Sequence, residues 1–487
     1  MFRLKKAPVY TLITSLLLGS VPNIALASNS IMLPDMGTTA ASTLTIDKEL
    51  EYGDAYMRML RSSKPIINDP VLTEYVQDLG HKLVANASDV RTPFTFFLIR
   101  DKEINAFAFF GGHVAIHSGL FLYAQNESEL ASVLAHEIAH VTQRHLARSM
   151  EEQAKRSPAT MAALVGSLML AIASPEAGIA AMQATTAASM QGQINYTRSN
   201  EKEADRIGIA TLAKAGFDPK AMPRFFERLA DQYRYVSKPP QMLLTHPLPE
   251  SRITDSRQRA SQYPTVRLPP SENYLLARSR IIARYANFSE NAALAWFGHQ
   301  LKKFPAQRKE LNYGKALVYI DNGKYKEANG LLTPLLAAEP NNPFYIDAMT
   351  DLDLYQQKFT PAIQRLKTAI EQNPDSTVLR LNYINVLQEQ GKYQQTIPLL
   401  VRYTYDQPDD INGWSMLAKA FAKTRQRPSE LAALAEIYAL RAQWDKAITN
   451  YMQASQLAPL NSMDQARFDA RIDQLRRAKM TFDNLKN

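Results

Sequence analysis

Cysteine is absent from the 487-residue sequence. The chain therefore has no disulfide bonds, and it cannot be a lipoprotein held through an N-terminal cysteine. Its stability must come from buried cores instead. At this length we expect two or more domains, each long enough to bury a sizeable core.

Clustered basic residues are absent as well. The formal net charge is +9, and the first 27 residues hold three cations and no acid, which leaves +6 for the remainder. This remainder is only mildly basic, and no run of Lys and Arg indicates a nucleic-acid groove. We expect no nucleic-acid partner.

The first apolar run is too short for a comfortable membrane span. Residues 9–18 are largely apolar, Arg3, Lys5 and Lys6 precede them, and an Ala-Leu-Ala cleavage site occupies 25–27. This is the layout of a secretory signal, whereas a retained helix needs about 20 apolar residues to span a bilayer. We expect residues 1–27 to be cleaved after Ala27 and the mature protein to lie in the periplasm.

The character of the sequence changes near residue 265. Seven prolines lie between residues 236 and 270, a density that breaks helices and marks loops or a linker. Motif-bearing helices and a short strand region precede this segment, and the sequence after it is almost wholly helical. We predict a mainly α protein with one domain over 28–265 and a second over 266–487.

The second domain contains an internal repeat. Aromatic residues recur every 34 residues at Tyr325, Phe359 and Tyr393, and prolines keep the same interval at Pro340, Pro374 and Pro408. This period resembles tetratricopeptide repeats, which stack helix pairs into an α-solenoid with a concave surface. The next equivalent aromatic, Trp444, follows 51 residues later, which indicates one missing helix. Repeats of this class bind other proteins and rarely carry chemistry, so we expect them to recruit substrates or a partner.

The first domain contains an H-E-x-x-H motif formed by His136, Glu137 and His140. Its surroundings predict a helix running to about Met150, which starts with a capping box at Asn126. Histidines at i and i+4 leave the same face of a helix one turn apart, as two ligands of one Zn²⁺ must. Glu137 lies beside the metal position, where a carboxylate can take a proton from zinc-bound water.

A second acidic motif supplies the third protein ligand that a catalytic zinc needs. Glu201 and Asp205 lie at i and i+4 on one face of a predicted second helix. Glu201 can bind the metal while Asp205 orients a ligand histidine through its other ring nitrogen. Glu203 points elsewhere and is a poorer candidate. Without the first motif, a solvated charged face would be the better interpretation.

With these motifs the chain resembles the zinc metallopeptidases related to the CAAX-prenyl-protein protease and to bacterial heat-shock membrane proteases. The resemblance covers roughly residues 45 to 260 and implies an N-terminal zincin-type α+β domain with a small sheet. The matching segments are Asn105-Ala106-Phe107, Gly111-Gly112-His113, His136 to His140, Glu201 to Asp205, Thr245-His246-Pro247 and Arg252. The signal and the repeats add a resemblance to the family's periplasmic members, which act on outer-membrane β-barrel proteins in Gram-negative bacteria.

This resemblance implies a zinc endopeptidase with one Zn²⁺ per chain. His136, His140 and Glu201 would bind the metal and Glu137 would be the general base, which also returns the proton to the leaving amine. The implied substrates are misassembled outer-membrane β-barrel proteins. The implied partner, reached through the repeats, is the barrel-assembly machinery, and the role is quality control.

His246 has two open roles in its Pro-flanked loop. It can donate a hydrogen bond to the oxyanion, as the resemblance implies, or occupy the fourth zinc position and exclude water. We hypothesise that it ligates zinc at rest and contacts the oxyanion in the active state; a structural histidine is the alternative. Arg252 would pair with an acid or contact the oxyanion. His145 lies about 140° round the predicted helix from His140 and is not expected to join the metal.

Residues 104–110 and 114–116 flank two glycines and predict a hairpin. Its edge strand can hold an extended substrate by strand addition, with Asn105 anchoring the substrate backbone. An ordinary structural hairpin is an equal alternative.

The stretch 158–191 contains two uncharged runs, each shorter than a membrane span. We expect a helical hairpin that covers the cleft as a mobile lid or rests on a membrane surface, with plain core packing as the alternative. For the whole chain, the competing function is a chaperone or scaffold that acts through its repeats and has a structural or inactive zinc site.

Overall fold

The structure is a computed structural model that describes residues 44–156, 190–235 and 239–484. The predicted signal and all but the last two residues of the predicted lid lie outside these ranges. Within them, no helix is both long enough and apolar enough to cross a membrane.

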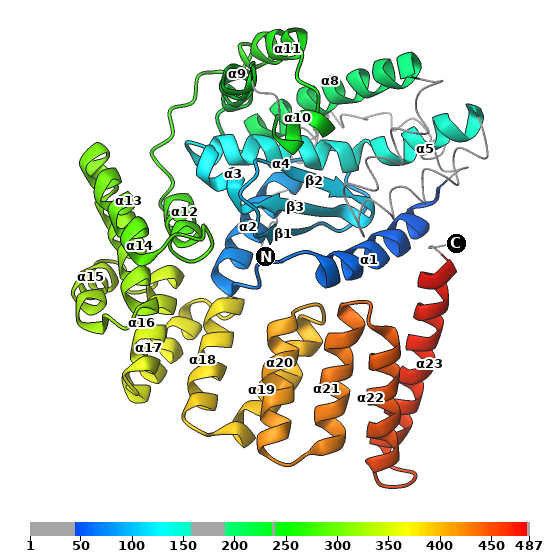
Figure 1. The fold of residues 1–487 in the computed structure, drawn as a ribbon, viewed down its shortest axis with the longest axis vertical. Helices are drawn as coiled ribbons and strands as arrows, with labels where there is room; N and C mark the ends of the chain where they lie inside the picture. The colour runs from blue at the N-terminus through cyan, green and yellow to red at the C-terminus, as the bar shows by residue number, and fades with distance from the viewer. Residues whose placement is uncertain (1–43, 157–189, 236–238, 485–487) are drawn as a thin grey trace, which may run out of the picture.

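A three-stranded sheet lies at the centre of the N-terminal half (Figure 1). Strand β3 (His113–His117) is in the middle, parallel to β1 (Thr95–Ile99) and antiparallel to β2 (Ala106–Phe109). The hairpin predicted from the two glycines is confirmed, because Gly111 and Gly112 both have φ of 78° in the turn between β2 and β3. Because β3 is the middle strand, β2 is an edge strand. Strand β1 was not predicted from the sequence.

Helices pack around this sheet and build the metal site. They are α1 (Ile46–Ser63), α2 (Pro70–Val84), the 3-10 turn η2 (Phe110–Gly112), α3 (Ser118–Tyr123), α4 (Glu127–Thr142), α5 (His145–Arg156), α8 (Met190–Lys214), α9 (Ala221–Tyr233), α10 (Gln241–Thr245) and α11 (Glu250–Ala260). The N-cap predicted at the start of α4 is present, because Asn126 Oδ1 accepts from the Glu129 amide. The return bond differs from a capping box, since Glu129 Oε2 accepts from the amide of Gln125, one residue before the cap. The apolar face of α4 packs into the main core, with Leu130, Leu134 and Ile138 fully buried.

Helix α4 ends earlier than predicted. It stops at Thr142 rather than running to Met150, and Arg144 adopts a left-handed conformation with φ of 53° before α5 begins. The Arg144 guanidinium is buried against α1, where Nη2 donates to Glu49 Oε1 at 2.8 Å and to the Leu44 carbonyl at 2.6 Å. These contacts hold the guanidinium away from the α4 axis and stabilise a break that helical periodicity does not reveal.

The C-terminal half is a series of helix pairs. They are α12 (Glu272–Arg284), α13 (Glu290–Lys303), the 3-10 turn η3 (Pro305–Gln307), α14 (Arg308–Asp321), α15 (Tyr325–Ala338), α16 (Pro343–Tyr355), α17 (Phe359–Gln372), α18 (Thr377–Glu389), α19 (Tyr393–Asp406), α20 (Ile411–Lys423), α21 (Arg427–Leu440), α22 (Trp444–Leu457) and α23 (Met463–Asn484). The three aromatics of the 34-residue period each begin a helix. The 51-residue interval that follows holds three helices, a pair and a half, as one missing helix requires.

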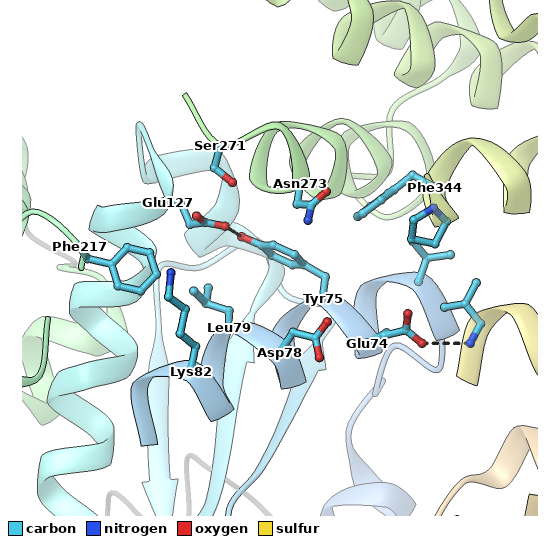
Figure 2. Close-up of a pocket in the computed structure, with 13 residues that line it drawn as sticks. Glu74, Tyr75, Asp78, Leu79, Lys82, Glu127, Phe217, Ser271, Asn273 and Phe344 are labelled. Atoms are coloured by element: carbon cyan, nitrogen blue, oxygen red, sulfur yellow. Dashed lines mark hydrogen bonds between the residues drawn. The ribbon is translucent and has the colours of Figure 1, made fainter. Parts of the chain in front are cut away.

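The repeats curve around the N-terminal half from α12 to α23 (Figure 1). Buried Arg280 on α12 lies 2.7 Å from Asp69, which caps α2, and 2.7 Å from Asp347 on α16. A cavity of ≈ 260 Å³ lies along this seam between the two halves. Figure 2 shows its lining residues, most of which come from α2, α12 and the starts of α16 and α18. There the Glu74 carboxylate of α2 accepts from the Val378 amide at 3.1 Å. The predicted boundary at 265/266 falls between α11 and α12.

Candidate metal centre

Helix α4 places two imidazoles side by side. His136 and His140 are one turn apart, and their Nε2 atoms are separated by 3.0 Å. Helix α8 lies against α4 because Gly208 has no side chain: a Cβ there would be 3.2 Å from backbone atoms of Ala135 and His136. This close approach brings the acidic face of α8 to the histidines.

Glu201 on α8 faces both rings. Its Oε2 lies 3.4 Å from His136 Nε2, and its Oε1 lies 3.4 Å from His140 Nε2. Burial raises the pKa of Glu201, but His246, His136 and His140 outweigh burial and hold this pKa far below its usual range. The group is therefore an ionised carboxylate, as a metal ligand must be.

His246 completes the cluster from the loop that follows α10. Its Nδ1 lies 3.1 Å from Glu201 Oε1 and 3.4 Å from His136 Nε2. Together, His136, His140, Glu201 and His246 offer four ligand atoms that all lie within 4.8 Å of one another. Three imidazoles, which must be neutral to bind a metal, and one carboxylate form a donor set suited to a transition metal such as Zn²⁺.

Glu137 turns toward the edge strand instead of joining this donor set. Its Oε2 accepts a hydrogen bond of 3.0 Å from the Ala108 amide of β2, and its Oε1 lies 3.5 Å from His246 Nε2. The side chain is buried, and burial raises the pKa of Glu137. A carboxylate with a raised pKa beside a metal position is equipped to accept a proton.

Asp205 and Arg252 support the cluster from behind. Asp205 Oδ1 lies 2.9 Å from His136 Nδ1, the nitrogen that faces away from the donor set. Arg252 Nε and Nη2 donate to the two Asp205 oxygens at 2.6 and 2.8 Å, and Nη1 lies 2.7 Å from Glu201. Arg252 is buried in this pairing with two acids, which corresponds to the first of the two roles considered for it.

His145 lies much closer to the cluster than the sequence analysis indicated. The continuous helix expected there would carry its ring away, but the break at Arg144 turns it back, so that His145 Nδ1 lies 2.9 Å from His140 Nδ1. Its Nε2 lies 3.1 Å from Glu203 Oε2. Burial lowers the pKa of His145 to about 4, so the ring is neutral at neutral pH. His145 is outside the group of four. Its predicted direction was wrong, because that prediction assumed a helix continuing past Thr142.

Asn105 immediately precedes the edge strand. Its backbone carbonyl accepts from the His117 amide at 3.0 Å, and its side chain is only 1% exposed. Within the described part of the chain, its Oδ1 has no hydrogen-bond partner. A direct contact between Asn105 and substrate stays a prediction, and access to it would require the edge strand to move.

A cavity of ≈ 310 Å³ opens in front of the cluster. Residues 107–111 of β2 and its turn form one wall, and Val141, Leu146 and Ala147 of the α4 and α5 region form another. Glu137, His140, Glu201 and His246 line the same space. An extended chain lying along β2 would thus pass the reactive groups. The cavity of Figure 2 contains none of these residues and is a separate feature of the seam.

Comparison with protein families assigns both halves. Residues 70–260 match the model of peptidase family M48, and residues 354–420 match a tetratricopeptide repeat model. The first match contains all eight residues proposed for the site, from Asn105 to Arg252. A metallopeptidase family match is consistent with four side chains that converge as possible metal ligands.

Individual relatives match over nearly the whole chain. A beta-barrel assembly-enhancing protease of Escherichia coli K12 is 50% identical over 99% of this chain and 99% of its own length. A Vibrio cholerae protein whose name gives the same activity provisionally is 63% identical, over 93% of this chain and 94% of its own. A mitochondrial metalloendopeptidase of Schizosaccharomyces pombe is 30% identical over 42% of this chain and 55% of its own.

Proposed function

Because this chain belongs to the family of β-barrel assembly-enhancing proteases and is a metalloprotease of peptidase family M48, we propose that it hydrolyses peptide bonds with one zinc ion per chain. His136, His140 and Glu201 hold the metal, which leaves a coordination position for water or substrate. The observation that carries this proposal is the convergence of these three donors and His246 from three separate segments. When bound, zinc would activate the water and polarise the scissile carbonyl.

Glu137 moves the proton in this mechanism. The Ala108 amide holds its Oε2, so Oε1 is oriented toward the space in front of His140 and His246. Glu137 accepts the proton of the attacking water and returns it to the leaving amine. An extended substrate adds to the free edge of β2, which keeps the scissile bond in front of Glu137.

His246 is proposed to hold the site closed at rest. Its Nδ1 lies among the ligand atoms, where it would fill the fourth position. Movement of the short α10 segment would free the ring to donate a hydrogen bond to the oxyanion instead. The His246 ring is therefore a ligand in the resting state and an oxyanion donor in the active state.

The decisive experiment replaces Glu137 by Gln. We expect the zinc content to stay at one per chain while cleavage falls by about 10²- to 10⁴-fold, the usual contribution of a general base. Glu127→Gln on the first turn of the same helix is the matched control and should retain both. Cleavage by the Glu137 variant with its metal intact would refute the assignment.

The proposed substrates are misassembled outer-membrane β-barrel proteins in the periplasm, recruited through the repeats together with the barrel-assembly machinery. The names of the close relatives support this role. A cavity of ≈ 510 Å³ among α19 to α23 offers a recruiting surface, lined by aromatic residues that include Trp414, Phe421 and Tyr405. Tyr405 is 78% exposed, so its ring is accessible to a partner that enters this cavity.

Replacing Tyr405 by Ser tests recruitment. We expect slower cleavage of a full-length protein substrate and unchanged cleavage of a short peptide, because only the former needs the repeats. Tyr235→Ser, at another highly exposed tyrosine outside the repeats, is the control. If a repeat variant alone removed the cellular phenotype and Glu137→Gln did not, the scaffold function would replace the peptidase function.

A further inference from the structure

The two ligand histidines are supported differently on their far sides. A histidine that binds a metal through Nε2 carries a proton on Nδ1, and that proton needs an acceptor. For His136 the carboxylate on that side is Asp205, whose Oδ1 lies 2.9 Å from Nδ1 as an ion-pair partner. For His140 the only described group at this distance from Nδ1 is another imidazole, His145 Nδ1, also at 2.9 Å.

This geometry fixes the protons of both rings. Since His140 Nδ1 must donate, His145 Nδ1 must accept, and a ring that accepts at Nδ1 carries its proton on Nε2. That nitrogen lies 3.1 Å from Glu203 Oε2, which is a hydrogen-bond acceptor. Arg148 Nη1 in turn donates to Glu203 Oε2 at 2.9 Å. The donors therefore all point away from the metal position, from His140 to His145 and from His145 to the Glu203 carboxylate.

Both ligand histidines are backed by a carboxylate of α8, His136 directly and His140 through His145. Asp205 and Glu203 are two residues apart on α8, and each carboxylate is held by an arginine, Arg252 for the first and Arg148 for the second. One carboxylate reaches its ligand histidine directly. The other is too far away and acts through an inserted imidazole, which is 4% exposed at its side chain.

We propose that His145 is a positioning residue that fixes the tautomer and ring orientation of His140 and thereby sets the affinity of the centre for zinc. The break after α4 brings its ring to His140, because a helix continuing through Arg144 would carry the ring away. This inference rests on the proposed ligand set of His136, His140 and Glu201. It concerns metal retention, which is measured without any substrate.

The test is zinc affinity, measured by competition with a chromophoric chelator on the full mature chain. His145→Ala removes the acceptor, and we expect a 10- to 100-fold weaker affinity, the usual range for the loss of such a partner. His145→Asn places an amide oxygen near the position of Nδ1 and should stay within about threefold of the unaltered protein. His117→Ala, at a buried histidine outside the cluster, is the control and should not change the affinity.

Two further measurements separate this role from a purely structural one. The Ala and Asn variants should unfold at similar temperatures in excess chelator, and only the Ala variant should change the visible spectrum of the cobalt-substituted centre. His145→Ala binding zinc within about threefold of the unaltered protein would overturn the inference, and so would equal losses in the Ala and Asn variants. Stoichiometric zinc in His136→Ala would instead overturn the proposed ligand set itself.

Discussion

A 3.0 Å hydrogen bond from the amide of Ala108 to the carboxylate of Glu137 joins the edge strand β2 to the proposed general base. Ala108 is paired with Val114 of β3 in register, yet its N–H points the other way, toward α4. The same edge that would align a substrate thus also fixes where Glu137 Oε1 lies. The Ala108 amide therefore links the position of a substrate on β2 to the orientation of the general base Glu137.

Ala108→Pro tests this link. Proline removes the donor but breaks no ladder hydrogen bond, because the Ala108 N–H does not point toward β3. We expect an unchanged zinc content and a fall in kcat/KM of about 100-fold, as for a misplaced catalytic group. Ala108→Ser keeps the amide and serves as the control. Full activity in the proline variant would show that the hydrogen bond does not position Glu137.

His246→Ala tests the resting ligand. Losing a fourth donor should weaken zinc binding, and losing the oxyanion donor should lower kcat by about 10²- to 10³-fold. Metal affinity by chelator competition and peptide cleavage should be measured on the same preparation. If both remain unchanged, His246 is a structural histidine; a loss of zinc affinity alone would leave it a ligand without a catalytic role.

Glu74→Ala tests the seam between the two domains. Its carboxylate accepts from the Ser376 and Thr377 hydroxyls and from the Val378 amide at the start of α18. Figure 2 marks the last of these bonds. Losing a cap of this kind costs about 1 to 2 kcal/mol of unfolding free energy. Glu74→Gln retains an acceptor and should lose less. Urea unfolding followed by tryptophan fluorescence measures the difference, and equal stability of the Ala variant would show that the contact contributes nothing.

Acid should loosen the same seam at Asp69. Burial raises the pKa of Asp69, but Arg280 outweighs burial and the net pKa lies below the usual value. A lowered folded-state pKa means that the stabilisation is present above about pH 4 and is lost as pH falls through the folded value. Stability curves from pH 6 to 2 should therefore fall less steeply for Asp69→Asn than for the unaltered chain. Parallel curves would contradict the assignment.

Spacing and residue type predicted much of the centre. One helical turn brings His136 and His140 together, and the same rule applied to Glu201 and Asp205 indicated one residue for the metal and one for a ligand histidine. The repeats were predictable for a similar reason, since a 34-residue period is written directly into the sequence. Local periodicity carries this kind of information reliably.

The break after α4 was not predictable in the same way. It depends on Arg144 meeting Glu49, a residue 95 positions earlier, and helical periodicity contains no trace of that contact. The predicted direction of the His145 side chain was wrong for the same reason, because it assumed a helix that ends at Thr142. The sequence did contain one signal for this contact, namely His145 five residues after His140 and Glu203 two residues after Glu201.

Arg252 gives the buried centre a definite charge balance. With the ligand histidines neutral, as metal binding requires, the ionised forms of Glu137, Glu201 and Asp205 carry three negative charges, and Arg252 supplies one positive charge through its contacts with two of them. A divalent cation makes the sum zero, whereas a monovalent ion leaves one buried negative charge. Electroneutrality in a low-dielectric interior therefore favours a dication, and an arginine-to-neutral substitution here would make the loaded site anionic and favour uptake of a proton.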